Sequence, residues 1–334
     1  MELPHKLISR GYYVGRSLIV LALLCGGASQ PVVGQSFTIK DLGTLSNGVF
    51  SVARGINDRG QVVGDSETNG LFQPHAFLFQ NGVMVDLGTL PGADFSEALG
   101  INNRGQVVGF SGATARFEFP VLVEDGVMVS LGTLPGGGDN NNQATSINDR
   151  RQVVGTASTA GGALHAFLFE NGVMADLGTL PGGSFSHAAG INDRGQVVGE
   201  ANTASGDKHA FLFENGVMID LGTLPGGTSS SAAGINNLGQ VVGSSSTASS
   251  FAHAFLFDNG VMVDLGTLPG GDFSEALGIN DHGRVVGSSS ATGRLSHAAL
   301  WIPKHRRSEH EEGEHQSDRE EWRHQRDEPD HLYP

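Results

Sequence analysis

One motif recurs six times along the chain and constrains its fold more than any other feature. The tetrapeptide Leu-Gly-Thr-Leu begins at residues 42, 87, 131, 177, 221 and 265, at intervals of 44 to 46 residues. Two further motifs keep the same period, Ile-Asn followed by Val-Val-Gly and His-Ala-Phe-Leu-Phe with its variants. Such a period is typical of repeat architectures, in which each copy is one supersecondary unit that buries its apolar face only against its neighbours.

Each copy contains the turn signals of four short antiparallel strands. In residues 165–199, Asn171-Gly172 supplies the positive φ angles of a type I′ hairpin turn. Pro181-Gly182-Gly183 and the segment Asn192 to Gly195 mark two further turns. Four antiparallel strands in about 44 residues is the size of a propeller blade. The sequence therefore predicts an all-β fold, a six-bladed β-propeller.

The two ends of the repeat region favour a closed ring over an open stack. The region begins at Phe37 with the second strand of a copy and finishes at residues 297–301 with a first strand. The two partial copies complete a blade only if they meet in space, so we expect the C-terminal strand to pair with the N-terminal one. Such pairing would also protect strand edges that invite aggregation.

The residues outside the repeats predict two further segments. Lys6, Arg10 and Arg16 precede a short apolar run and small residues, as in a secretory signal peptide over residues 1–34, cleaved near 28–34. The run is too short to span a membrane stably. Cleavage would remove Cys25, the only cysteine, although a lipid anchor on Cys25 is an alternative. The propeller then covers residues 35–302, and residues 303–334 form a charged tail with the composition of a disordered segment.

The charge balance excludes one class of partner. The chain has 35 acidic and 20 basic residues and a formal net charge of −15. A nucleic-acid binder needs clustered cations to displace the counterions of phosphate. We therefore expect no nucleic-acid partner. The signal peptide, not the charge, predicts a secreted, periplasmic or cell-envelope location.

The copies resemble those of a known family of bacterial extracellular proteins. His165-Ala-Phe-Leu-Phe-Glu-Asn-Gly-Val-Met-Ala-Asp-Leu-Gly-Thr-Leu and Gly190-Ile-Asn-Asp-Arg-Gly-Gln-Val-Val-Gly look like the HAF repeat. The resemblance covers essentially all of residues 37–302 and implies export, without an established activity. The third copy departs from the pattern, with Phe119 in place of His and Ser130 in place of Asp. This departure argues against a role that needs six equivalent sites.

Five histidines share one repeat position, at the head of the His-Ala-Phe strand, and allow two interpretations. If that strand were innermost, the imidazoles could hold a divalent cation near the axis. Otherwise each ring would bond a backbone group of the neighbouring blade, which is the interpretation we favour, so we expect no metal and no cofactor. The histidines are His75, His165, His209, His253 and His297.

One position varies between otherwise uniform copies, and such variation is where a repeat protein places recognition. Phenylalanines lie two residues before it in several copies. Exposed rings would stack on a sugar or a peptide, whereas buried rings would only pack between blades. The predicted binding face comprises Glu97, His187, Glu275, Phe95, Phe185 and Phe273; other copies have Val52, Gln143 and Ser231 at the variable position.

Together these features predict a monomeric, exported propeller that acts as a binding or scaffold module for an extracellular glycan, a peptide or protein, or a surface partner. No nucleophile elbow or phosphate-binding loop occurs in the sequence. One alternative is a hydrolase or lyase on extracellular polysaccharide, with Glu97 or Glu275 as acid/base and His187 assisting. A purely structural envelope component is the other.

Overall fold

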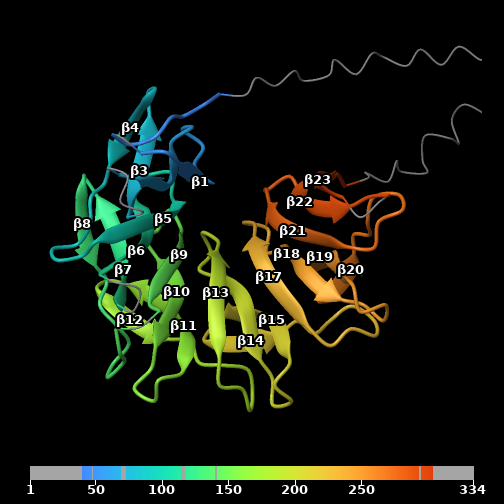
Figure 1. Ribbon diagram of the computed structural model, residues 1–334. Helices are drawn as coiled ribbons and strands as arrows, with labels where there is room; N and C mark the ends of the chain where they lie inside the picture. Colours follow the sequence, from blue (N-terminus) through green and yellow to red (C-terminus); the bar gives the residue numbers. More distant parts are fainter. Residues whose placement is uncertain are drawn as a thin grey trace, which may run out of the picture. The chain divides into compact units, whose positions relative to one another are not determined.

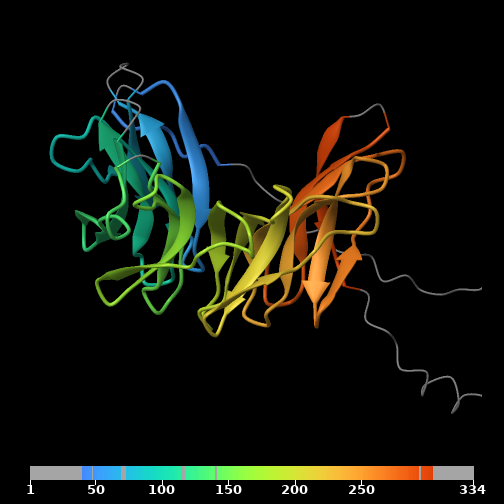
Figure 2. The same cartoon turned by 90° about the horizontal axis from the view of Figure 1, so that it is seen from below.

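A computed structural model describes residues 40–303, except residues 47, 69–72, 114–116, 140 and 293–294. Within these residues every helix or strand assigned is a β-strand, and 23 strands form six antiparallel sheets (Figures 1 and 2). The sheets stand around a common axis, which confirms the predicted six-bladed β-propeller. The predicted signal peptide and nearly all of the charged tail lie outside the described residues.

Each sheet is one blade, and the blades are numbered in chain order. Blade 1 contains β1 (Ser51–Ile56), β2 (Val62–Glu67), β3 (Pro74–Gln80) and β4 (Val83–Asp86). Blade 2 contains β5 (Phe95–Ile101), β6 (Val107–Ala113), β7 (Phe117–Glu124) and β8 (Val127–Ser130). Blade 3 contains β9 (Gln143–Ile147), β10 (Val153–Ser158), β11 (Leu164–Glu170) and β12 (Val173–Asp176).

The second half of the chain repeats the same order. Blade 4 contains β13 (Ser186–Ile191), β14 (Val197–Asn202), β15 (Lys208–Glu214) and β16 (Val217–Asp220). Blade 5 contains β17 (Ser230–Ile235), β18 (Val241–Ser246), β19 (Ala252–Asp258) and β20 (Val261–Asp264). Blade 6 contains β21 (Ser274–Ile279), β22 (Val285–Ser290) and β23 (Ser296–Trp301).

Each blade takes its strands from two successive sequence copies. The strand that precedes the Ile-Asn turn lies nearest the axis, followed outward by the Val-Val-Gly, His-Ala-Phe and Val-Met strands (Figure 1). The histidine-bearing strand is therefore third from the axis. The interpretation that placed the five histidines near an axial channel is wrong, because strands with small residues, such as Ser186 to Ile191, occupy the inner position.

The turns have the predicted conformations. Asn171 and Gly172 have φ angles of 54° and 82°, as a type I′ hairpin turn requires. At the inner turn, the Gly195 N–H donates to the Asn192 carbonyl at 3.0 Å, and Gly195 has a φ of 82°. Local turn chemistry thus sets the ends of the strands, as the sequence indicates.

The hydrophobic core lies between consecutive blades. Between blades 2 and 3, Val108 and Leu122 pack with Val153 and Phe167, and all four are completely buried. The Leu-Gly-Thr-Leu connector adds Leu134 to the same cluster. The repeated connector therefore supplies apolar contacts between the blade that it leaves and the blade that it enters.

Blade 6 has three strands among the described residues. Residues 37–39, which are expected to begin its outermost strand, lie outside the described residues, and Lys40 and Asp41 belong to no strand. The predicted pairing of the two chain ends stays a prediction. Among the described residues, no helix is long and apolar enough to cross a membrane.

One glycine of each blade lies where its strand crosses very close to the innermost strand. A Cβ at Gly199 would overlap the carbonyl oxygen of His187, which is backbone and cannot rotate away. We expect Gly199→Ala to lower the free energy of unfolding by about 3 kcal/mol, because the β13–β14 ladder must separate to admit a methyl group. Urea denaturation measures this change.

Gly138→Ala is the matched control. A Cβ at Gly138 would meet no atom within 4 Å, and Gly138 is not among the glycines with a positive φ. We expect this variant to stay within about 0.5 kcal/mol of the parent protein. Equal losses in the two variants would contradict the close approach at Gly199.

Candidate functional site

A cavity of about 530 Å³ opens at the axis, and the inner turn of all six blades lines it. Each blade contributes the last residue of its inner strand, an isoleucine, and the two residues that follow. The cavity therefore has an apolar isoleucine layer and a polar rim of asparagine and aspartate. His282 of blade 6 is the remaining lining residue.

The first polar residue of each turn connects its blade to the next. The Asn192 side chain is buried, and its Oδ1 accepts from the backbone N–H groups of Arg194 and Gln196, both at 3.0 Å. Its Nδ2 donates to the carbonyl of Asn236 in blade 5 at 3.0 Å. The same bond to the next blade starts from Asn57, Asn102, Asn148 and Asn236.

The second polar residue forms a ring of acceptors around the cavity. Its backbone N–H donates to the side-chain Oδ1 of the equivalent residue one blade further on, as from Asp149 to Asp193 at 2.9 Å. This bond occurs at the five interfaces from blade 1 to blade 6, at 2.8 to 2.9 Å. In blade order the ring residues are Asp58, Asn103, Asp149, Asp193, Asn237 and Asp281.

Two amides reduce the repulsion between the four carboxylates of this ring. Asn103 Nδ2 donates to Asp58 Oδ2 at 2.8 Å and to Asp149 Oδ2 at 3.3 Å. Asn237 Nδ2 likewise donates to Asp193 and Asp281, at 3.2 and 3.3 Å. The ring therefore presents carboxylate oxygens to the cavity while its own amide hydrogens are used within the ring. In the described part of the chain, no three His, Cys, Asp or Glu side chains form a group that could hold a metal ion.

The three variable residues of the predicted binding face lie on innermost strands, but the structure does not bring them together. Glu97 belongs to blade 2, His187 to blade 4 and Glu275 to blade 6, and none lines the axial cavity. Glu97 pairs with Arg54 of blade 1 at 2.9 Å, and Arg54 also binds the buried Asp65 at 2.6 Å. Burial raises the pKa of Glu97 above its ordinary value, against the opposing charge of Arg54.

His187 and Glu275 also have partners inside the propeller. The Nδ1 atom of His187 bonds the hydroxyl of Thr156 in blade 3. Burial lowers the pKa of His187, although the nearby carboxylate of Glu200 opposes this. Glu275 accepts a hydrogen bond from the Ser288 hydroxyl of its own blade at 3.0 Å. These contacts connect strands and blades.

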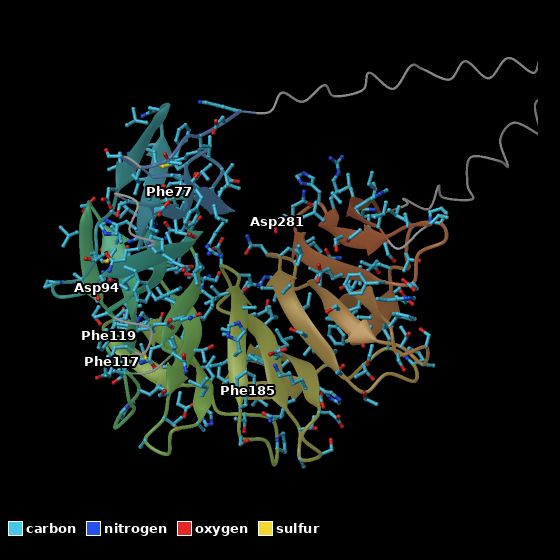
Figure 3. All side chains as sticks on the ribbon, in the orientation of Figure 1. Phe77, Asp94, Phe117, Phe119, Phe185 and Asp281 are labelled. Atoms are coloured by element: carbon cyan, nitrogen blue, oxygen red, sulfur yellow. The ribbon has the colours of Figure 1, made fainter. Side chains whose placement is uncertain are left out.

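The three phenylalanines are half-buried and act in packing. Phe95 stacks edge-to-face on Phe110 at a centroid distance of 6.1 Å. Phe185, labelled in Figure 3, is covered by the Lys208 ammonium group 5.0 Å above its ring. Phe273 is also partly covered, and its carbonyl accepts from the hydroxyls of Ser289 and Ser290. Of the two interpretations of these rings, the arrangement favours packing.

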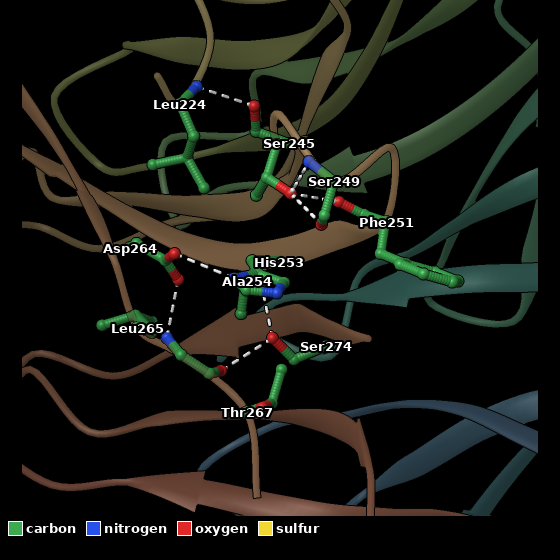
Figure 4. Close-up of polar contacts among 12 residues, drawn as sticks. Leu224, Ser245, Ser249, Phe251, His253, Ala254, Asp264, Leu265, Thr267 and Ser274 are labelled. Atoms are coloured by element: carbon green, nitrogen blue, oxygen red, sulfur yellow. Dashed lines mark hydrogen bonds and ion pairs between the residues drawn. The ribbon is translucent and has the colours of Figure 1, made fainter. Parts of the chain in front are cut away.

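The histidines of the third strand pair with the aspartates of the fourth. His253 Nδ1 lies 2.8 Å from Asp264 Oδ2, and Asp264 Oδ1 accepts the N–H of Gly266 at 2.7 Å (Figure 4). The expectation that each ring bonds a backbone group of the neighbouring blade is wrong for the Nδ1 atoms of these histidines, because they bond the carboxylate across the hairpin. The same pair occurs in blades 1, 3 and 4 as His75–Asp86, His165–Asp176 and His209–Asp220. Each of these aspartates also accepts the backbone N–H of the glycine two residues further on.

Sequence reasoning missed both the axial ring and the His–Asp pairs. The Asn-Asp segments have the composition of ordinary turns, so their second role in lining a cavity has no separate signal in one copy. The pair did leave a signal, because the copy that lacks the histidine also lacks the aspartate, with Phe119 and Ser130 in their places. His297 of blade 6 is exposed, and no such bond is seen for it in the structure.

No protein-family model and no curated protein matches the sequence. Among solved structures, TolB from Acinetobacter baumannii is 12% identical with a TM-score of 0.43, covering 75% of this chain and 54% of TolB. Dipeptidyl peptidase 4 from Porphyromonas gingivalis is 12% identical with a TM-score of 0.49, covering 79% of this chain and 45% of the peptidase. A six-bladed fungal lectin from Aleuria aurantia is 10% identical with a TM-score of 0.36, covering 75% and 90%. The chain spans about half of the first two proteins, and these distant similarities transfer no ligand or activity.

The lowered pKa of His187 gives the protein a pH dependence of a defined sign. Between the lowered value and the ordinary value of about 6.5, the unfolded chain binds more protons at this site than the folded protein. The folded state therefore loses stability as the pH falls through this window. We expect the melting temperature of the parent protein to fall further between pH 8 and pH 5.5 than the melting temperature of the His187→Gln variant. Differential scanning calorimetry measures both.

The control for this experiment is Ser231→Ala, at the equivalent position of blade 5. This variant changes no titratable group, so its pH dependence should match that of the parent. Identical pH profiles for the parent and His187→Gln would contradict the assigned burial of the imidazole.

The axial asparagines give a further prediction. Asn192→Asp removes the two donors that reach Asn236 and Gln196 and places an anion against their oxygens. We expect a loss of about 3 kcal/mol in the free energy of unfolding, measured in urea at pH 7. The reverse exchange at the next residue, Asp193→Asn, keeps the Oδ1 acceptor for Asp149 and loses only the Oδ2 acceptor of the Asn237 amide, so it should change stability by about 1 kcal/mol.

Proposed function

We propose that this protein is an exported binding module of the HAF-repeat type that takes an extracellular glycan or peptide at its axial cavity. The observation that carries the proposal is a single cavity to which all six blades contribute the same turn. Concave sites lined by apolar walls and a few convergent polar groups are typical of ligand binding. The leader-like composition of the N-terminus supports export.

The chemistry of the rim selects the kind of group that would enter. The backbone N–H groups of the ring already donate to Oδ1 atoms of the next blade, so the rim offers acceptors rather than donors. A ligand must therefore bring donors, either the hydroxyls of a glycan or the ammonium or guanidinium groups of a basic peptide. The isoleucine layer would contact the aliphatic part of such a ligand.

Calorimetric titration of the protein with three probes tests the proposal. The probes are chitotetraose, a Lys-rich pentapeptide and a Glu-rich pentapeptide of equal length. We expect saturable binding of the first or the second and none of the third, because the rim is acidic. A ligand present at 100 times its dissociation constant should also stabilise the fold by about 2.7 kcal/mol.

Two variants locate the site. Asp149→Asn/Asp193→Asn removes two rim carboxylates and keeps the ring of Oδ1 acceptors. Asp207→Asn removes one carboxylate from an exposed loop that does not line the cavity. We expect the double variant to weaken binding at least tenfold and the control to bind as the parent does. Equal affinities would place the ligand elsewhere, and no saturable binding of any probe would favour the purely structural alternative.

A further inference from the structure

The histidine–aspartate pairs lie at the opposite end of the blades from the axial cavity. In blade 1 the inner turn precedes Val62, the first residue of β2, which pairs with Phe79 near the end of β3. His75 pairs with Ser66 near the other end of β2, and the ring of His75 bonds Asp86 at the end of β4. This pair is therefore separate from the groups that line the axial cavity.

Blade 2 keeps the turn bond of the aspartate without having the pair. Asp86 Oδ1 accepts the N–H of Gly88 at 2.7 Å. Ser130 stands at the equivalent position of blade 2, and its hydroxyl oxygen accepts the N–H of Gly132 at 3.1 Å. Blade 2 forms the same four-stranded sheet, with Phe119 in place of the histidine. The fold thus forms without the pair, which leaves the pair available for another role.

The pair of blade 1 is the most exposed of the four. Its imidazole is 25% exposed and its carboxylate 44%, against 19 to 21% and 39 to 42% in blades 3, 4 and 5. His75 Nδ1 lies 2.9 Å from Asp86 Oδ2. A neutral imidazole that donates from Nδ1 keeps its lone pair on Nε2. The pair therefore offers a nitrogen acceptor beside an accessible carboxylate.

In blade 1 the pair lines a cavity of about 280 Å³. The connector that enters the blade, the residue after β2 and the outermost strand supply the other walls. Besides His75 and Asp86, the lining residues are Thr44, Leu45, Ser46, Thr68 and Met84. The cavity thus combines polar groups from several segments of one blade with apolar side chains.

The threonine hydroxyls of this cavity also keep lone pairs for a ligand. Thr44 Oγ1 donates its hydrogen to the carbonyl of Gly48 at 3.1 Å. Thr68 Oγ1 donates to the carbonyl of Gln73 at 3.3 Å. A hydroxyl whose hydrogen is used by the backbone can still accept. Together with the pair, these oxygens give the cavity acceptors in several positions.

The connector into blade 1 differs from the other five at one residue of the cavity. Ser46 follows the Leu-Gly-Thr-Leu motif, whereas proline follows it in every other copy. Serine adds a hydroxyl, which can donate as well as accept. A difference between otherwise uniform copies is where a repeat protein places recognition.

The lining selects a small neutral ligand with several hydroxyl groups. No lysine or arginine is among the described lining residues, so an anion would meet the Asp86 carboxylate without a compensating cation. A lone ammonium group would gain little, because exposed ion pairs contribute little and Asp86 already accepts from His75 and Gly88. The volume lies below the roughly 300–1,000 Å³ of sites for drug-sized ligands, which suits one sugar unit.

We propose that the blade 1 cavity binds a single neutral sugar unit, with His75 Nε2 and the Asp86 carboxylate accepting hydrogen bonds from its hydroxyl groups. The apolar side of the sugar ring would contact Met84. Because the cavity lies at the other end of the blade, this site does not depend on what the axial cavity takes.

Ligand-observed NMR with simple glycosides tests this site. The probes are the methyl glycosides of glucose, galactose, mannose, N-acetylglucosamine and fucose, and lysine methyl ester is the cationic comparison. We expect saturable binding of at least one glycoside and a shift of the His75 ring nitrogens on titration. No saturable glycoside, or binding of lysine methyl ester alone, would overturn the proposal.

Two matched double variants assign the binding to the cavity. His75→Phe/Asp86→Ser gives blade 1 the residue types that blade 2 already carries. His165→Phe/Asp176→Ser makes the same exchange in blade 3 and is the control. We expect the blade 1 variant to weaken glycoside binding about tenfold or more, because two acceptors are lost, and the control to bind as the parent does. Equal losses in the two variants would contradict a site in the blade 1 cavity.

The axial variant Asp149→Asn/Asp193→Asn separates this site from the axial one. It alters the axial rim alone, so glycoside binding in blade 1 should not change even if chitotetraose binding at the axis weakens. If this variant abolished glycoside binding and His75→Phe/Asp86→Ser did not, the sugar would lie at the axis and the present proposal would be wrong.

A single substitution provides a test that leaves the pair intact. Thr68→Ala copies Ala113 of blade 2 and removes one acceptor from the cavity. Thr203→Ala in blade 4 removes the same kind of bond to a loop carbonyl and is the matched control. We expect Thr68→Ala to weaken glycoside binding about fivefold, as the loss of one hydrogen bond implies, and Thr203→Ala to leave it unchanged. The opposite result would overturn the proposal.

Discussion

The side-chain amide of the axial asparagine is the interaction on which the rest of the propeller depends. Its oxygen closes the turn of its own blade, and its nitrogen binds the carbonyl of the next blade, as Asn148 does toward Asn192. Each bond contributes on the order of 1 kcal/mol, but a buried amide left without partners would cost more. One side-chain amide thus serves both the turn of its own blade and the contact with the next blade. Local turn geometry and the order of blades around the axis are therefore coupled.

The number of blades and their turns could be predicted because their signals are local. An Asn-Gly pair such as Asn171-Gly172 predicts a hairpin turn from two residues alone. The number of repeat copies, six, gives the number of blades. The order of strands from the axis outward could not be predicted, because antiparallel pairing is compatible with either end of a blade at the centre. The physical signal for the inner strand is the size of its residues. Innermost strands converge, so they need Gly100 or Gly190 where adjacent backbones approach.

The residues of the variable position lie on the innermost strands and bond to neighbouring strands. Glu97, His187 and Gln143 do lie on innermost strands, yet each bonds a different partner: Arg54, Thr156 and Glu118 respectively. Such unlike contacts make each junction distinct from the others. A ring of six nearly identical blades can otherwise pair in the wrong order, because the apolar contacts are interchangeable. Variation between copies therefore makes the junctions between blades 1 and 2, 2 and 3, and 3 and 4 chemically distinct, while the uniform residues form the cavity.

The axial rim is not sixfold, although the fold that carries it is. In blade order its residues are Asp, Asn, Asp, Asp, Asn and Asp, so blades three positions apart carry the same residue type. Each asparagine donates to the aspartates on both sides, which concentrates uncompensated negative charge at two places. One is the junction of Asp149 with Asp193, and the other comprises Asp58 and Asp281, at the two ends of the bonded series. A ligand with two cationic or hydroxyl-rich ends would match this two-fold pattern better than a single central charge would.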